Sequence, residues 1–177
     1  MLKPINHIKN FYDESTRREL NNWTLINYKN KNIFTDSNHN PPGTSYTTRW
    51  TESQIEFPKA AYSLQQKIID HLNFKDYKLR YGQGIINTVN YPGCIVWEHK
   101  DGGGIIADYI TYHCNIVSKK PKDGGITDIE GKLYNIDHGD LLCYAVSELN
   151  HSVTMVKDSI RMMWVFAFHV HESEIEL

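Results

Sequence analysis

The chain has 177 residues, of which 40% are hydrophobic and 23% are charged, and its formal net charge is -2 at pH 7. These values are ordinary for a globular protein of one domain, and they exclude the strongly basic surface that binds nucleic acid or an anionic membrane. No apolar run has membrane-spanning length and no signal peptide is recognisable, so we expect a cytoplasmic protein that binds neither nucleic acid nor membrane.

Residues 1–77 are predicted to be helical or mixed in structure. Asp13 or Ser15 can cap a short helix that ends near Leu20. Residues 23–34 alternate weakly between apolar and polar positions, which predicts two strands joined by a polar turn.

A loop and a second helix come next. Residues 36–45 are rich in Asn, Ser, Pro and Gly, a composition typical of a loop. Apolar residues at spacings of three and four predict a helix from Pro58 to Leu72. Nine short β-rich runs then follow, separated by Gly, Pro, Asn and Asp. They are Lys78–Tyr81, Ile85–Asn90, Ile95–His99, Ile105–Val117, Thr127–Ile129, Leu133–Ile136, Asp140–Val146, Ser152–Val156 and Arg161–His169.

The nine runs have no helical pattern between them, which implies antiparallel strands in a sandwich or barrel. Helices that precede such a barrel pack on one of its outer faces. We therefore expect a mainly β protein, with residues 1–177 in a single domain. Within it, residues 1–77 would form a buttress and residues 78–170 the β core.

The three cysteines are widely spaced, and each lies in an apolar, strand-like run. An odd number of cysteines at this spacing fits neither a disulfide framework nor a zinc site. We expect Cys94, Cys114 and Cys143 to be free thiols in the core.

Four residues of the β-rich part indicate a metal centre with an anion anchor. His99 and Asp101 end one strand-like run, His151 follows fifty positions after Asp101, and Arg161 lies ten residues further on. Two imidazoles and one carboxylate can cap one face of an Fe(II) ion and leave three coordination positions open. An Arg on the next strand supplies a permanently charged fork for a carboxylate.

The setting of the first two ligands supports this interpretation. Residues of equal parity share one face of a strand, so Trp97, His99 and Asp101 are expected to point into one interior. Trp97 there would either floor a substrate pocket or belong to the ordinary core. The glycines at residues 102–104 allow close approach of the backbone to a metal or substrate. For His99 and Asp101 taken singly, a solvated pair at a strand end is the alternative.

A second His-x-Asp triplet occurs at His138 and Asp140. The Gly between them is typical of a tight turn that enters a strand. The triplet begins only thirteen residues before His151, which is too close for strands on opposite sheets of a barrel. We therefore expect a structural turn here.

From about Tyr81 to His169 the chain resembles the 2-oxoglutarate- and Fe(II)-dependent oxygenases, most closely the prolyl 4-hydroxylase-like branch. The matching stretches stand in the family's order and cover about half of the chain. They are Asn90-Tyr-Pro-Gly93, His99-Lys-Asp101, Tyr109-Ile-Thr111, Gly124-Gly-Ile-Thr127, His138-Gly-Asp-Leu-Leu142, Asn150-His-Ser-Val153 and Arg161-Met-Met-Trp164. The resemblance implies a double-stranded β-helix, a jelly-roll or cupin-like barrel with helices packed on one sheet.

The resemblance also implies roles for the four spaced residues. His99, Asp101 and His151 would be the iron ligands. Arg161 would bind the distal carboxylate of 2-oxoglutarate. The carboxylate of Asp101 favours hydroxylation, since halogenating members of the family lack it.

Five further positions are implied to contact the cosubstrate. Tyr91 and Thr127 match places where the branch often contacts 2-oxoglutarate. Thr111, His113 and Asn115 would point inward from one strand. The branch often has a Tyr near Asn115, so His113 or Asn115 would hold the cosubstrate in this chain. A hydrogen-bonded core histidine is the alternative for His113.

The implied enzyme is a dioxygenase that uses Fe(II) as cofactor and 2-oxoglutarate and O2 as cosubstrates. It would hydroxylate an unactivated C–H bond of a prolyl residue, a peptide or a free amino acid, with release of succinate and CO2. Its partner would thus be a small-molecule or peptide substrate. A catalytically silent jelly-roll binding module is the alternative. A nucleobase demethylase ranks lower, because no second Arg follows Arg161 in the run Met-Met-Trp-Val-Phe-Ala-Phe.

Overall fold

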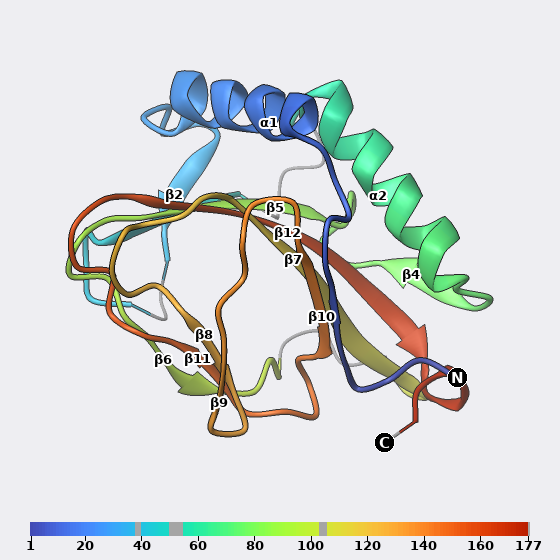
Figure 1. Ribbon diagram of the computed structural model, residues 1–177. Coiled ribbons are helices and arrows are strands. Elements are labelled where there is room, and N and C mark those ends of the chain that lie inside the picture. The colour runs from blue at the N-terminus through green and yellow to red at the C-terminus, as the bar shows by residue number, and fades with distance from the viewer. Residues whose placement is uncertain (38–39, 50–54, 103–105, 177) are drawn as a thin grey trace.

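The structure is a computed structural model that describes residues 1–37, 40–49, 55–102 and 106–176. The described residues form an eight-stranded and a four-stranded antiparallel sheet, so the protein is mainly β as predicted. Two α-helices cover the outer face of the larger sheet, and the smaller sheet lies on its other side (Figure 1).

The two helices are α1 (Glu14–Asn27) and α2 (Lys59–Leu72). Asp13 caps α1 by accepting a hydrogen bond from the backbone N–H of Thr16, which confirms one of the two predicted caps. The helix predicted from Pro58 to Leu72 is confirmed as α2, with Pro58 at its N-cap.

The strand pair predicted within residues 23–34 is wrong, because α1 continues to Asn27. Leu20 and Thr24 are fully buried at helical spacing. Trp23 packs against Phe57 and Trp164, with ring centroids 5.3 and 5.4 Å apart. This aromatic contact with the large sheet favours the helix over the weak alternation of the sequence.

The large sheet has the order β1-β10-β7-β12-β5-β3-β2, and β4 also pairs with β12. Its strands are β1 (Ile5–Ile8), β2 (Phe34–Asp36), β3 (Ser45–Thr48), β4 (Tyr77–Leu79), β5 (Ile85–Asn90), β7 (Tyr109–Lys119), β10 (Leu141–Ala145) and β12 (Arg161–His171). The small sheet has the order β6-β11-β8-β9. Its strands are β6 (Val96–His99), β8 (Thr127–Ile129), β9 (Lys132–Tyr134) and β11 (His151–Val153).

All nine predicted β-rich runs contain strands, from β4 to β12. The run predicted from residue 105 is described only from residue 106 and forms β7 from Tyr109. The prediction missed β1, β2 and β3, which add strands to both edges of the large sheet. In particular, β3 begins at Ser45, the last residue of the predicted loop.

Side chains of β12 point alternately to the two faces of the large sheet. Trp164, Phe166 and Phe168 are fully buried in the core beneath the helices. Arg161 and Met163 line a cavity on the opposite face, toward the small sheet. The large sheet therefore has an apolar face for the helices and a more polar face for a site.

The second His-x-Asp triplet forms the predicted turn before β10. Gly139 has a φ of +92°, a conformation open to glycine at little cost. Asp140 is buried, accepts a hydrogen bond of 2.6 Å from Lys9 Nζ, and lies 3.0 Å from His7 Nε2. The triplet thus ties the turn to β1 and its flank.

Two expectations drawn from composition can also be compared with the structure. Cys94, Cys114 and Cys143 are free and buried, as predicted. No helix in the described part of the chain is long and apolar enough to cross a bilayer.

Candidate metal centre

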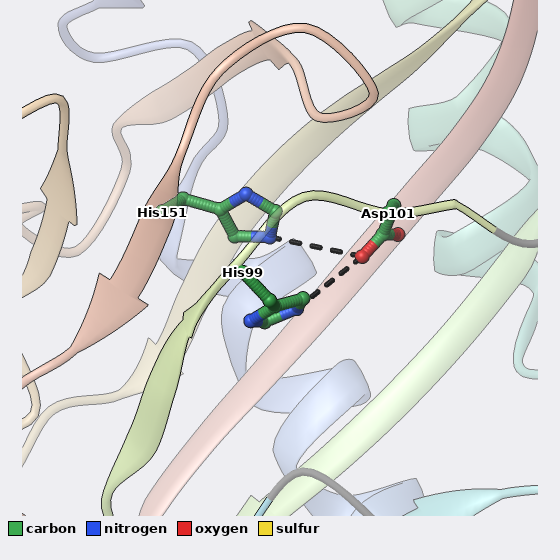
Figure 2. A group of neighbouring side chains, drawn as sticks. All are labelled: His99, Asp101 and His151. Carbon is green, nitrogen blue, oxygen red and sulfur yellow. Dashed lines mark ion pairs between the residues drawn. The ribbon is translucent and has the colours of Figure 1, made fainter.

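His99, Asp101 and His151 converge at one end of the small sheet (Figure 2). The antiparallel pairing of β6 and β11 sets His151 directly opposite His99. Asp101 follows β6, and its backbone N–H donates to the carbonyl oxygen of Val146 at 2.9 Å. One potential ligand atom from each of the three side chains lies within 4.8 Å of the others. The structure thus brings together the three residues predicted as ligands.

The orientation of both imidazoles is fixed by the backbone. Nδ1 of His99 lies 2.7 Å from the carbonyl oxygen of Trp97, and Nδ1 of His151 lies 3.1 Å from that of Leu149. A carbonyl oxygen only accepts, so each Nδ1 carries the proton in the neutral ring. Each Nε2 faces Asp101 Oδ1, at 3.3 Å for His99 and 3.8 Å for His151. In the neutral ring Nε2 carries the lone pair that a cation would take, whereas a protonated ring donates from Nε2 to the carboxylate. Three electron-pair donors that converge in this way fit a divalent cation.

The carboxylate of Asp101 stays ionised despite its burial. Burial alone would raise the pKa of this carboxyl, but the hydrogen bond with His99 and the Arg80 guanidinium hold the pKa well below its usual range. Arg80 Nη1 donates to Asp101 Oδ2 at 2.7 Å. The hydrogen bond to Asp101 in turn raises the pKa of His99. The group therefore supplies one full negative charge to a bound cation.

A cavity of about 650 Å³ lies between the two sheets and includes this group. Its volume is in the range of pockets for small molecules. His99 and His151 line it from the small sheet, whereas Asn115 and Arg161 line it from the large sheet. Ile86 and Val165 add an apolar wall.

Arg161 is a buried cation in this cavity. Its residue is only 1% exposed, and burial lowers the pKa of its guanidinium to about 10, so it remains charged at neutral pH. Nη1 lies 3.3 Å from Asn90 Oδ1, and Nη2 lies 3.4 Å from Thr127 Oγ1. Both partners are neutral, and no Asp or Glu among the described residues forms an ion pair with Arg161. A buried charge of this kind favours an anionic ligand.

Gly125 makes room for this arginine, and Gly124 makes room for the neighbouring backbone. A Cβ on Gly125 would lie 2.9 Å from Cδ of Arg161, and one on Gly124 would collide with the backbone of Met155. Both glycines also have a positive φ. The absence of a side chain at Gly125 therefore leaves space for the arginine, whose Nη2 reaches Thr127 two residues further on.

His113 and Asn115 face the cavity from β7, as expected. Burial lowers the pKa of His113 to about 3, so its ring is neutral, and Nε2 accepts from Arg80 Nη1 at 3.1 Å. Asn115 Nδ2 donates to the hydroxyl of Tyr144 at 3.2 Å, and Asn115 Oδ1 has no partner. Thr111 is buried beside His169, with 3.4 Å between Oγ1 and Nδ1, and does not line the cavity.

Two further residues with a predicted place in the site, Tyr91 as a cosubstrate contact and Trp97 as an inward residue, lie outside this cavity. Tyr91 packs against Tyr28 and Tyr46 in a separate pocket of about 470 Å³. Trp97 is 53% exposed, so its prediction as an inward residue is wrong. The pairing of β6 with β11 shifts register between His99 and Val96, and the extra residue breaks the alternation on which the prediction rested. Of the glycines at residues 102–104, the last two lie outside the described residues.

Arg80 and Tyr144 line the cavity but were not predicted. Tyr144 lies opposite His113 in the pairing of β10 with β7, so strand alternation could have identified it. Arg80 comes directly after β4, where no periodicity indicates the direction of a side chain.

No family model and no curated protein sequence matches the chain. Solved structures do. A viral collagen prolyl hydroxylase from Paramecium Bursaria Chlorella virus-1, in complex with 2-oxoglutarate, is 15% identical, with a TM-score of 0.70 over 94% of this chain and 96% of that chain. A prolyl hydroxylase from Trichoplax adhaerens, in complex with a hypoxia inducible factor peptide fragment, is 15% identical, with a TM-score of 0.70 over 97% of this chain and 85% of that chain.

HygX from Streptomyces hygroscopicus, with nickel, 2-oxoglutarate and hygromycin B bound, is 8% identical, with a TM-score of 0.68 over 94% of this chain and 83% of that chain. At these identities the comparisons show the fold. The chain has the fold of the prolyl hydroxylases and related 2-oxoglutarate–Fe(II) oxygenases.

Proposed function

We propose that the chain is an Fe(II)- and 2-oxoglutarate-dependent dioxygenase that hydroxylates a C–H bond, and that its two sheets form a double-stranded β-helix. The observation that carries the proposal is the presence of two complementary features in one cavity. These are the convergent donors of His99, Asp101 and His151, and the buried guanidinium of Arg161. A metal alone would not require the arginine, and an anion alone would not require the imidazoles.

The donor set fits iron and its cosubstrate. Two imidazole nitrogens and one carboxylate oxygen suit Fe(II) with open positions. Arg161, aided by Thr127, would hold the distal carboxylate of 2-oxoglutarate through two parallel hydrogen bonds. With both bound, the site would convert O2, 2-oxoglutarate and a substrate C–H bond into succinate, CO2 and a C–OH bond.

In this reaction the side chains of the protein would orient the bound groups and shape the cavity. His99 and His151 keep their Nδ1 protons on backbone carbonyls, which leaves both Nε2 atoms as ligands. Asn115 and Tyr144 offer an amide oxygen and a hydroxyl next to the cosubstrate position. Ile86 and Val165 give the cavity one apolar wall, which would help to keep water from the reacting groups.

We propose a prolyl residue, a peptide or a free amino acid as the substrate class. The fold is shared with prolyl hydroxylases, one of which holds a peptide in its structure. HygX, with hygromycin B bound, shows that the same fold also accepts a different small molecule. The cavity volume of about 650 Å³ leaves room for a substrate group beside the cosubstrate.

The test is formation of succinate by the Fe(II)-loaded protein with 2-oxoglutarate and O2, first alone and then with amino acids and proline-containing peptides. We expect slow turnover alone and faster turnover with a true substrate. Asp101→Ala should lose retained metal and succinate formation with little change in circular dichroism. His138→Ala, in the second His-x-Asp triplet, is the matched control and should behave as the wild type.

Loss of metal in the His138→Ala variant would place the centre elsewhere. Binding of 2-oxoglutarate with no succinate under any condition would identify a silent binding module instead.

A further inference from the structure

Arg80 is held in place by the large sheet. Its backbone N–H donates to Ala167 of β12 at 3.0 Å, and its carbonyl oxygen accepts from Gly84 at 2.8 Å. The guanidinium carbon lies 4.4 Å from the centre of the Tyr81 ring. The residue is 3% exposed and lines the cavity. Its position is therefore set by contacts that do not involve the metal ligands.

The two oxygens of Asp101 face different partners. Oδ1 is the atom nearest to the two imidazoles, at 3.3 Å from His99 Nε2 and 3.8 Å from His151 Nε2. Oδ2 accepts from Arg80 Nη1 at 2.7 Å. The same Nη1 lies 3.1 Å from His113 Nε2, a second acceptor that fixes its direction. One oxygen is thus available to a cation, and the other is engaged.

Asp101 needs such a partner because its backbone hydrogen bond to Val146 places the main chain but does not set the rotation of the carboxylate. It lies beyond the end of β6, and Gly102 follows it. Rotation of its carboxylate would present both oxygens to a metal, and a second bound oxygen would occupy a position that the cosubstrate needs. Hydrogen bonds to the outer oxygen of a ligating carboxylate fix its orientation.

We propose that Arg80 is a positioning residue that keeps Asp101 a ligand through Oδ1 alone. This inference rests on the proposed function. Arg80 anchors the outer oxygen, which would leave coordination positions of a bound metal free for 2-oxoglutarate and O2. Because Arg80 is itself cationic, it would repel a metal ion, so orientation and repulsion predict opposite effects of its removal.

Binding of Mn(II) to the metal-free protein tests the proposal. Arg80→Gln removes the charged fork and should weaken Mn(II) binding by about 10–100-fold, as removal of such outer partners does. Arg80→Lys keeps a charge without the fork, so a smaller loss is expected. Lys78→Gln is the matched control, since Lys78 is an exposed cation two residues earlier whose amine lies over the Tyr109 ring. It should bind Mn(II) as the wild type does.

A second measurement separates positioning from a general loss of structure. At saturating Fe(II) without O2, bound 2-oxoglutarate gives a charge-transfer band. In Arg80→Gln a higher concentration of 2-oxoglutarate should be required to form this band, and its wavelength should shift. Mn(II) affinity equal to or tighter than wild type in this variant would overturn the proposal. If Arg80→Gln does not fold, Arg80→Lys decides by the same criterion. A wild-type protein that binds neither metal nor 2-oxoglutarate would refute the proposed function itself.

Discussion

Arg161→Met is expected to have opposite effects on ligand binding and on the stability of the ligand-free protein. Met keeps an unbranched, apolar stem that reaches about as far as Nε of the arginine, and it removes the charged group. The guanidinium is fully desolvated, and its described partners are the neutral side chains of Asn90 and Thr127, at 3.3 and 3.4 Å. The charged guanidinium is therefore expected to destabilise the folded protein when no anion is bound, and to contribute to affinity when an anion binds.

The loss of binding can be estimated from this environment. Removal of one partner of a buried, hydrogen-bonded charge pair costs about 2–5 kcal/mol. Since about 1.4 kcal/mol corresponds to tenfold, the affinity for 2-oxoglutarate should fall by about 30-fold or more. Arg161→Lys should recover part of it, because an ammonium replaces the fork imperfectly.

The ligand-free protein should respond in the other direction. Burial lowers the pKa of Arg161 to about 10, which means that the charged form is disfavoured in the folded state. Replacement by an apolar side chain should leave the free energy of unfolding unchanged or raise it by up to about 2 kcal/mol. The stabilisation of about 2.7 kcal/mol expected from 2-oxoglutarate at about 100 times its Kd should disappear.

The assay is an anaerobic titration of Fe(II)-loaded protein with 2-oxoglutarate, followed by its charge-transfer band, together with urea unfolding with and without ligand. Lys157→Met is the control, since Lys157 is exposed and lies 3.0 Å from Asp123. Unchanged affinity in Arg161→Met, or a loss in Lys157→Met, would refute the assignment of the anchor.

Two further predictions concern other parts of the protein. The buried thiols of Cys94 and Cys114, whose pKa values burial raises, should react with a thiol reagent only as the protein unfolds, and rapid labelling of the native protein would contradict this. Burial alone would raise the pKa of Asp140, but hydrogen bonds from Lys9 and other groups lower it. The ionised carboxylate therefore stabilises the folded protein above about pH 4, and this contribution is lost as the pH falls through the pKa of the folded state. Asp140→Asn should therefore lower the free energy of unfolding at pH 7 by about 1–3 kcal/mol and make it less dependent on pH. Urea unfolding between pH 7 and pH 3 measures this, and parallel plots of unfolding free energy against pH for wild type and variant would disprove it.

The parts of the fold that follow from local pattern could be predicted. The apolar spacing of α2 and the β-rich runs from β4 to β12 are properties of neighbouring residues. The extension of α1 depends on the packing of Trp23 against Trp164, a residue far away in the chain. Similarly, β1 is short and becomes a strand through its pairing with β10. Contacts of this range leave no periodic trace in the sequence.

In the candidate site, too, some residues could be predicted from the sequence and others could not. The meeting of His99, Asp101 and His151 was predicted from their residue types together with the resemblance of their spacing to a known family. The pairing of β6 with β11 sets the two imidazoles opposite each other. The exposure of Trp97 depends on one extra residue in β6, which alternation cannot reveal. Arg80 reaches Asp101 from a turn whose direction is set by β12.

The place of β12 within the large sheet has a consequence for how the protein folds during synthesis. Of the described strands β12 comes last in the chain, yet it lies between β7 and β5 and pairs with both. Until the ribosome has released it, β1, β10 and β7 have no strand to join them to β5, β3 and β2. Such long-range pairing is slow and exposes unpaired edges, which chaperones commonly protect. Because Arg161 is the first residue of β12, the proposed anchor for 2-oxoglutarate reaches the cavity only when this strand joins the two halves of the sheet.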